Sequence, residues 1–362
     1  MRFKENWGTG AKERLTALLE KEIIDRCTMA IPVVTNPARA NELYKKPEGA
    51  DGLLKQYSDP EAYHELMVER FKCVSYCGES LPCVFANYGV GGHAAYMGGN
   101  PVYTPTSVWF KPVIDSWEND HTVYDPNHHI LQLQINLMKR LSELGKGQYF
   151  VSMPDNCGSM DGVAGLRGSE NLLEDMYEHP EHVQNALKKA LYALEESSKV
   201  LFEAAKESNE GGSSQSWMHL WSPGKLLQLQ CDLSVMISPS MFEKFILPEL
   251  EETVRWLDHS VYHLDGIEQL RHLDMILSVR KLDMIQWTRV VGQPPTSDNM
   301  AALQKIQKAG KGLVLFPELW EIEKFLTELS PKGLHLVVRG INTVEDANDL
   351  IKMAEQKTAG KI

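Results

Sequence analysis

The chain has 362 residues, a net charge of −12 and 43% hydrophobic residues, a composition typical of a folded, soluble protein. Its acidic balance, without a basic tract, argues against a nucleic-acid partner, and no apolar stretch is long enough to predict a membrane span. The first residues lack the apolar core of a signal peptide and the six cysteines contain no CxxC pair, so we expect a cytoplasmic protein with free thiols.

Eight short segments rich in β-forming residues alternate with longer segments in which apolar residues recur every three or four positions. In chain order the expected strands are residues 31–35, 83–87, 149–153, 216–220, 261–265, 283–287, 312–316 and 333–338. A strand followed by a helix, repeated eight times, predicts an α/β fold with a (β/α)8 TIM barrel. No linker or internal repeat divides the sequence, so residues 1–362 are predicted to form a single domain.

The predicted barrel carries two additions. A helical extension precedes the first strand. After strand two, residues 87–126 are rich in Gly, Tyr, Trp and Pro and are too long for a simple connection, so we expect a long loop that covers the barrel mouth. Its glycine-rich part, residues 88–99, fits no nucleotide-binding motif, and we expect it to lie over the pocket.

Catalytic residues of such a barrel lie at the C-terminal ends of the strands. The residues expected there are mostly polar or aromatic, although ionisable groups inside a barrel are unfavourable unless they are paired or liganded. We therefore predict substrate contacts at seven of them, while each one alone also has a structural interpretation. The seven are Tyr88, Asp155, His219, Trp221, Gln286, Trp287 and Arg339.

His263 and Asp265 form the sharpest pair, because residues two apart on a strand point to the same face and can converge on a metal ion or a proton. The alternative is that Asp265 caps the following helix and His263 is a hydrogen-bonded core residue. A catalytic zinc needs three protein ligands, for which His219, Cys231 and Glu318 are candidates, and we take Glu318.

Asp232 precedes a helix that is expected to begin near Pro239. This position would bring the carboxylate to the active face of the barrel, so we predict that Asp232 acts in catalysis with His263 and Asp265. An aspartate that forms a turn by bonding its own backbone is an equal alternative.

Several short motifs occur together in the second half of the chain. They are Ile-Ser-Pro-Ser-Met-Phe-Glu-Lys-Phe-Ile-Leu-Pro at residues 237–248, Tyr-His-Leu-Asp-Gly at 262–266, Leu-Asp-Met-Ile-Leu at 273–277, Asp-Met-Ile-Gln-Trp at 283–287 and Gly-Gln-Pro-Pro at 292–295. In this combination the sequence resembles the uroporphyrinogen decarboxylase superfamily over roughly residues 60 to 358. The resemblance implies a single-domain (β/α)8 barrel.

The decarboxylase branch of this superfamily carries an arginine-rich N-terminal motif that holds the carboxylates of a tetrapyrrole. The matching region, residues 22–32, lacks that motif and has only Arg26 and Arg39 nearby. Uroporphyrinogen decarboxylation is therefore not the expected activity.

The other branch comprises corrinoid-dependent methyltransferases, in which a His-x-Cys pair on strand five and a Cys after strand eight bind zinc. Here His263 stands at the histidine, Asp265 replaces the first cysteine, and Arg339 falls near the place of the second. The resemblance thus implies a zinc site with oxygen ligands, which suits polarisation of the heteroatom of a methyl donor better than activation of a thiol.

We expect a methyltransferase that moves a methyl group from a small methylated O-, N- or S-compound to a corrinoid carried by a separate protein, since no corrinoid-binding DxHxxG segment is present. The methyl donor would lie between Tyr88 and Trp287. One alternative is a metal-assisted decarboxylase or lyase in which Arg339 anchors a small carboxylic acid. Another is a ligand-binding descendant without catalysis. The charge permits a monomer and related barrels are often dimers, so both states stay open.

Overall fold

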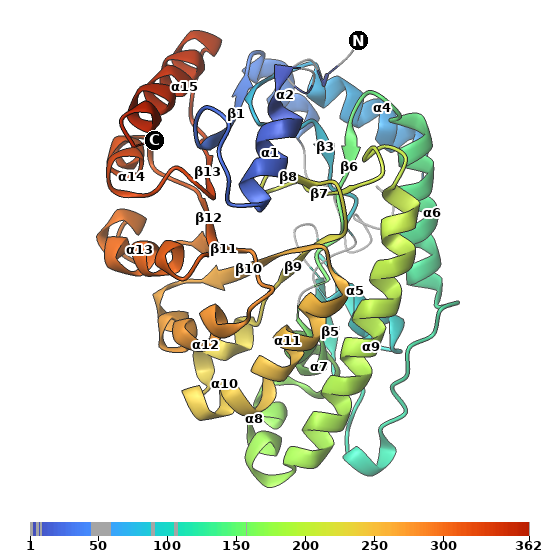
Figure 1. Ribbon diagram of the computed structural model, residues 1–362. Helices are drawn as coiled ribbons and strands as arrows, with labels where there is room; N and C mark the ends of the chain where they lie inside the picture. The colour runs from blue at the N-terminus through green and yellow to red at the C-terminus, as the bar shows by residue number, and fades with distance from the viewer. Residues whose placement is uncertain are drawn as a thin grey trace.

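The computed structural model describes residues 3–4, 7, 9–44, 59–87, 91–104, 108–156 and 158–361. Its centre is a seven-stranded sheet in the order β2-β1-β13-β12-β11-β10-β9 (Figure 1). All neighbours from β1 to β9 pair in parallel, and β2 runs antiparallel to β1. The strands are β1 (Thr28–Val34), β2 (Val74–Gly78), β9 (Leu226–Leu229), β10 (His259–Asp265), β11 (Met284–Thr288), β12 (Gly312–Leu315) and β13 (Leu334–Val337).

Residues along these strands alternate between two separate hydrophobic cores, because successive side chains of a strand point to opposite faces of the sheet. One core lies between the sheet and the helices and takes residues such as Ile31, Leu264 and Leu313. The other fills the opposite face, here called the inner face, and takes Ala30, Val261, Met284, Val314 and Val337. Strands β9, β12 and β13 are buried along their whole length, as expected of a parallel sheet covered on both sides.

The predicted N-terminal helical extension is present. Helix α1 (Ala11–Leu19) precedes β1 and contributes Leu15, Leu18 and Leu19 to the core of the inner face, together with Trp7. This helix therefore covers part of the inner face of the sheet.

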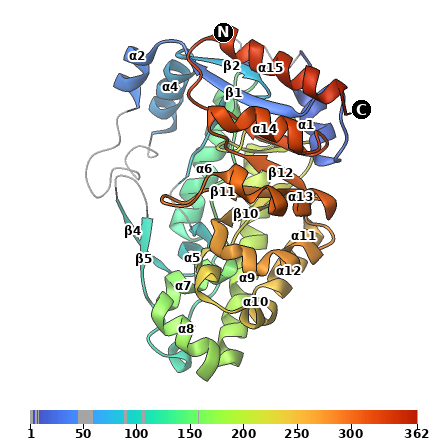
Figure 2. The ribbon, with the colours of Figure 1, turned by 90° about the vertical axis from the view of Figure 1, so that its left-hand side faces the viewer.

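The remaining helices follow the strands and lie around the sheet (Figures 1 and 2). The C-terminal helices α13, α14 and α15 lie on one side of the molecule in Figure 1, and the long helices α6 and α9 lie on the other. Among the described residues, no helix has both the length and the apolar character needed to cross a membrane. The helices around the sheet are α2 (Pro37–Leu43), α4 (Pro60–Phe71), α6 (His129–Leu144), α7 (Ser159–Arg167), α8 (Ser169–Glu178), α9 (Pro180–Ala205), α10 (Pro239–Phe245), α11 (Leu247–Trp256), α12 (Leu273–Ser278), α13 (Met300–Lys308), α14 (Ile322–Glu328) and α15 (Val344–Ala359).

The prediction of an α/β fold with a parallel sheet is confirmed, whereas the strand pairing does not run as one continuous ring. Predicted strands two and three contain β3 (Cys83–Val84) and β6 (Phe150–Val151), which pair in parallel apart from the main sheet. The backbone N–H of Met153 donates to Ser214 O at 3.0 Å and so connects β6 to the next strand, β7 (Ser213–Gln215). Among the described residues, no strand pairing joins β3 to β1.

The prediction of a fourth strand at residues 216–220 is wrong. These residues form most of the turn between β7 and the antiparallel strand β8 (Leu220–Ser222), and the strand that pairs with β10 is β9. The alternation of Trp217, Met218 and His219 resembles a strand, but His219 has a φ of 50°, in the left-handed region, which a strand does not allow.

The long segment after predicted strand two contains secondary structure of its own. Helix α5 (Gly92–Tyr96) is followed by a hairpin of β4 (Asn100–Tyr103) and β5 (Val108–Lys111) and by a short 3-10 helix, η2 (Trp117–Asn119). Figure 2 shows the hairpin at one edge of the molecule.

A buried ion pair fixes the turn that follows β2. The guanidinium of Arg26 donates two hydrogen bonds of 2.9 Å to the carboxylate of Glu79, which also accepts the backbone N–H of Met29 at 2.8 Å. The turn depends on Gly78, whose φ is 59° and at which any Cβ atom would lie only 2.0 Å from Met29 O. The edge strand β2 is thereby tied to the beginning of β1.

We expect Glu79→Ala to lower the free energy of unfolding by about 3–5 kcal/mol, because it leaves the guanidinium of Arg26 buried without its partner. Urea unfolding followed by circular dichroism measures the change. Glu42→Ala removes an exposed ion pair with Arg39 and should cost no more than about 0.5 kcal/mol. Equal losses in the two variants would contradict the role given to the buried pair.

Candidate active site

Three side chains from two elements converge at the C-terminal end of β10. His263 and Asp265 lie on one face of β10, with His263 Nε2 3.9 Å from Asp265 Oδ1. Asp232 begins the 3-10 helix η3 (Asp232–Met236), which follows β9. Ligand atoms of Asp232, His263 and Asp265 all lie within 4.8 Å of one another. This set is called the Asp-His-Asp group below.

The strand register fixes the orientation of the His263 ring. His263 on β10 lies directly beside Gln286 on β11, and a hydrogen bond joins His263 Nδ1 to Gln286 Oε1. The amide nitrogen of Gln286 donates to Thr288 Oγ1 at 3.0 Å, which orients the amide so that its oxygen faces the ring. Nδ1 therefore carries the proton, and the lone pair of Nε2 faces the carboxylates.

Asp161 holds Asp232 in place from a distant part of the chain. Its carboxylate, on α7, accepts the backbone N–H groups of Asp232 at 2.9 Å and Leu233 at 3.0 Å. The Asp232 side chain is then free of the turn-forming role considered above and accepts a hydrogen bond from Gln230 Nε2 at 3.3 Å. Asp161 is thus a positioning residue for the group.

The electrostatics of the group favour a bound cation. Burial and the negative charge of Asp232 raise the pKa of Asp161 to about 7. Burial also raises the pKa of Asp232, and the negative charge of Asp265 adds to this shift. Carboxylates placed this close repel one another unless a proton or a metal ion lies between them. One imidazole nitrogen and two carboxylates are a ligand set that zinc accepts, and they leave a position for a substrate atom.

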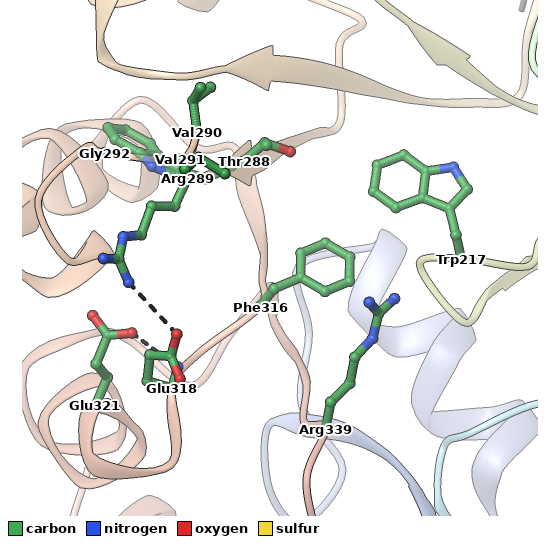
Figure 3. A pocket seen from close by; sticks show the side chains of 11 residues that line it. Trp217, Thr288, Arg289, Val290, Val291, Gly292, Phe316, Glu318, Glu321 and Arg339 are labelled. Atoms are coloured by element: carbon green, nitrogen blue, oxygen red, sulfur yellow. Dashed lines mark hydrogen bonds and ion pairs between the residues drawn. The ribbon is translucent and has the colours of Figure 1, made fainter. Parts of the chain in front are cut away.

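A cavity of about 500 Å³ opens at the C-terminal ends of β11, β12 and β13 (Figure 3). Trp217 and Phe316 form an aromatic wall, with ring centroids 5.6 Å apart and planes 13° from parallel. The Trp217 ring also meets the His263 ring edge to face at 5.6 Å, so the wall leads to the Asp-His-Asp group. The lining residues are Trp217, Trp287, Thr288, Arg289, Val290, Val291, Gly292, Phe316, Glu318, Glu321 and Arg339.

A second cavity, of about 530 Å³, reaches Asp232. It is bounded by β5, α7 and η3, and both Asp161 and Asp232 line it. Asp232 therefore connects the Asp-His-Asp group to the second cavity, and the contact of Trp217 with His263 connects the group to a wall of the first.

The structure brings some predicted site residues together. Gln286 contacts His263, and Arg339 lines the first cavity, where its guanidinium lies 5.3 Å from the Phe316 ring centroid. His219 accepts the backbone N–H of Leu81 on its Nδ1 at 2.9 Å. Trp287 lines the same cavity but is only 2% exposed, since it faces the helices.

Other predicted site residues lie elsewhere. Glu318, expected as a third metal ligand, lines the first cavity and pairs with Arg289 at 3.5 Å, and it is Asp232 that stands beside His263 and Asp265. Trp221 is a core residue that packs on Trp7 and donates to Asn209 O. Asp155 and Tyr88 were also expected near the substrate. Asp155 lies in the loop after β6, where its backbone N–H donates to Asn87, and Tyr88 lies outside the described residues.

The sequence reasoning passed over the roles of Asp161 and Phe316. Phe316 ends the seventh predicted strand, so its place in the cavity at the strand ends follows from the same rule that selected Glu318. Asp161 occurs in a turn-like segment, and its bonds to residues 232 and 233 are visible only in the folded chain.

Comparison with solved structures finds a methyltransferase from Methanosarcina mazei, with a TM-score of 0.61 and 12% sequence identity over 96% of this chain and 98% of that chain. The likeness therefore extends over nearly the whole of both chains and concerns their fold. No protein-family model matches the sequence, and no curated protein matches it either.

We expect one divalent metal ion per chain, bound by Asp232, His263 and Asp265. Asp232→Asn and His263→Ala should each abolish near-stoichiometric zinc binding, measured by titration calorimetry and by elemental analysis of untagged protein. Glu318→Gln is the matched control and should bind as the wild type does. Loss of zinc in Glu318→Gln but not in Asp232→Asn would assign the third ligand to Glu318 instead.

Asp161→Asn should weaken zinc binding by about 10- to 100-fold, because residues that orient a metal ligand contribute effects of this size. The exposed Asp274, which pairs with Lys305, provides the control Asp274→Asn, with unchanged affinity. Melting temperatures of the metal-free variants separate a general loss of stability from a specific loss of metal affinity. Unchanged zinc binding in Asp161→Asn would refute the positioning role.

Proposed function

We propose that this protein is a methyltransferase of the uroporphyrinogen decarboxylase superfamily, which moves a methyl group from a small methylated compound to a corrinoid on a separate protein. The observation that carries the proposal is the Asp-His-Asp group beside an aromatic-walled cavity at the strand ends. The likeness in fold to the methyltransferase from Methanosarcina mazei supports it, as do the motifs around residues 237–295.

The chain's own residues supply distinct parts of this function. The first cavity admits the methyl donor against Trp217 and Phe316, which exclude water from one side of it. Zinc held by the Asp-His-Asp group would supply a Lewis acid near the donor's heteroatom. Gln286 keeps His263 Nε2 directed at this position, and Asp161 keeps Asp232 there.

In the overall reaction, the bond between the heteroatom and the methyl carbon would break and that carbon would bond to the cobalt of a Co(I) corrinoid. The cobalt would supply both electrons of the new bond and become formally Co(III). The heteroatom keeps the bonding electron pair and takes up a proton. The second cavity, which Asp232 lines, gives the acceptor an approach to the group. The proposal also includes a cytoplasmic location for the protein. It further includes a single domain in which the strands close a (β/α)8 barrel.

A metal-assisted decarboxylase or lyase is the second candidate. It is favoured by one observation: Arg339 lines the first cavity without an ion pair to any described residue, so it can anchor a substrate carboxylate. In that reaction His263 and Asp265 would move a proton.

A methyl-transfer assay separates the two candidates. Zinc-loaded protein is mixed with cob(I)alamin and a panel of methoxy, methylamine and methylthio compounds, and methylcobalamin is followed by its absorbance. We expect turnover with at least one donor and a loss of about 100-fold or more in Asp265→Asn, because the cation and its ligands act directly on the reacting group. Asp274→Asn, at an exposed position outside the cavity, should keep the wild-type rate. Release of carbon dioxide from carboxylic acids without methyl transfer would establish the lyase instead.

A further inference from the structure

The charged side chains of the first cavity differ in whether they have an ion-pair or hydrogen-bond partner. Glu318 pairs with Arg289 at 3.5 Å, and Arg289 also donates to the backbone O of Gln293. The carboxylate of Glu321 accepts two backbone N–H groups, from Ser297 at 2.8 Å and from Glu318 at 2.9 Å. Arg339 has neither an ion pair nor a hydrogen bond to any residue that the structure describes, and its guanidinium lies over the Phe316 ring. Figure 3 shows Arg289 and Glu318 on one side of Phe316 and Arg339 on the other.

His219 belongs to the same turn as Trp217 of the cavity wall, and its Nε2 has no hydrogen-bond partner among the residues that the structure describes. Its Nδ1 accepts the backbone N–H of Leu81, so the ring proton resides on Nε2. Burial, followed by the charges of His335 and Arg339, lowers the pKa of His219 to about 3, and the ring stays neutral. The turn between β7 and β8 holds His219 in a left-handed conformation at this place.

We propose that the first cavity binds its substrate through a carboxylate, which accepts hydrogen bonds from the guanidinium of Arg339 and from His219 Nε2. A site that offers a cation and a neutral N–H donor, with its acidic groups already engaged, selects a planar anion. The apolar part of the acid then lies along the wall formed by Phe316 and Trp217.

The row of side chains also sets the orientation of the substrate. From Arg339 to the Phe316 ring the distance is 5.3 Å, from Phe316 to Trp217 it is 5.6 Å, and from Trp217 to His263 it is again 5.6 Å. A carboxylate at Arg339 therefore directs the opposite end of an elongated acid toward the Asp-His-Asp group. This part rests on the proposed function: the methyl donor is an apolar or aromatic carboxylic acid with its methylated heteroatom far from the carboxylate.

The test measures binding in metal-free protein, so that a carboxylate cannot bind to zinc. Benzoate, cyclohexanecarboxylate and benzamide are titrated by ligand-observed NMR and calorimetry after dialysis against a chelator. We expect both acids to bind and benzamide, which has the same shape without the charge, to bind at least about tenfold more weakly. Tighter binding of benzoate than of cyclohexanecarboxylate indicates an aromatic acid, and the reverse indicates an aliphatic one.

Two variants and one matched control assign the contact. Arg339→Gln should weaken benzoate binding about tenfold or more, whereas Arg289→Gln, with the same change of charge in the same cavity, should change it less than about threefold. His219→Asn keeps an acceptor for Leu81 N–H and a residue type that tolerates a positive φ, yet removes the Nε2 donor, and should weaken binding by several-fold. Melting temperatures confirm that the variants are folded.

Failure to bind either acid, or equal losses in Arg339→Gln and Arg289→Gln, would overturn the carboxylate site. Unchanged binding in His219→Asn would overturn the part assigned to His219. Because these measurements involve neither zinc nor a corrinoid, they remain decisive if the protein proves to have no methyltransferase activity. Conversely, methyl transfer from an uncharged donor would leave the proposed function in place and refute the substrate class.

Discussion

The period-two alternation of a parallel strand is the constraint on which the whole site depends. It sends Tyr262 and Leu264 of β10 to the helices and His263 and Asp265 to the inner face. The same rule, applied across the register, places Gln286 next to His263 and Thr288 next to Asp265. A one-residue shift of either strand would bury the polar pair against the helices, where nothing compensates the cost of desolvation. The apolar packing of the helix-covered face thus holds the polar groups of the inner face in position.

The site needs more than one strand, and its remaining parts come from distant segments of the chain. Asp232 reaches the group because Asp161 on α7 accepts two backbone N–H groups of η3. Trp217 reaches it because the turn between β7 and β8 folds toward the inner face, where His335 Nε2 and Met218 O lie 2.9 Å apart. These contacts connect the irregular half of the sheet to the regular one. The polar network therefore serves both the geometry of the ligands and the packing of the least regular strands.

Local sequence rules predicted the parallel α/β fold and the shared face of His263 and Asp265, because both depend on periodicity within one element. They could not identify the third candidate metal ligand, because that choice depends on contacts between residues far apart in sequence. Arg289 pairs with Glu318, whereas Asp161 brings Asp232 to the histidine. The fourth strand was misplaced because an apolar-polar alternation also occurs in a turn when one residue adopts a left-handed conformation, as His219 does. Trp221 was expected at the substrate for the same reason and instead fills the core beside Trp7. Closure of the barrel stays a prediction, because it depends on pairings between distant short strands.

The separation of Arg339 from the Asp-His-Asp group follows from the chemistry that each would perform. A carboxylate substrate is itself a good ligand for a hard cation, so a site with the anion receptor next to the metal would bind such a substrate by the wrong end. Here Phe316 and Trp217 stand between Arg339 and His263, and neither ring offers a ligand atom. The charge on Arg339 draws the carboxylate to the far end of this wall, while the oxygen donors of Asp232 and Asp265 leave a bound cation able to polarise an ether or amine at the near end. The oxygen ligands of the Asp-His-Asp group and the arginine that follows β13 thus suit the same class of substrate.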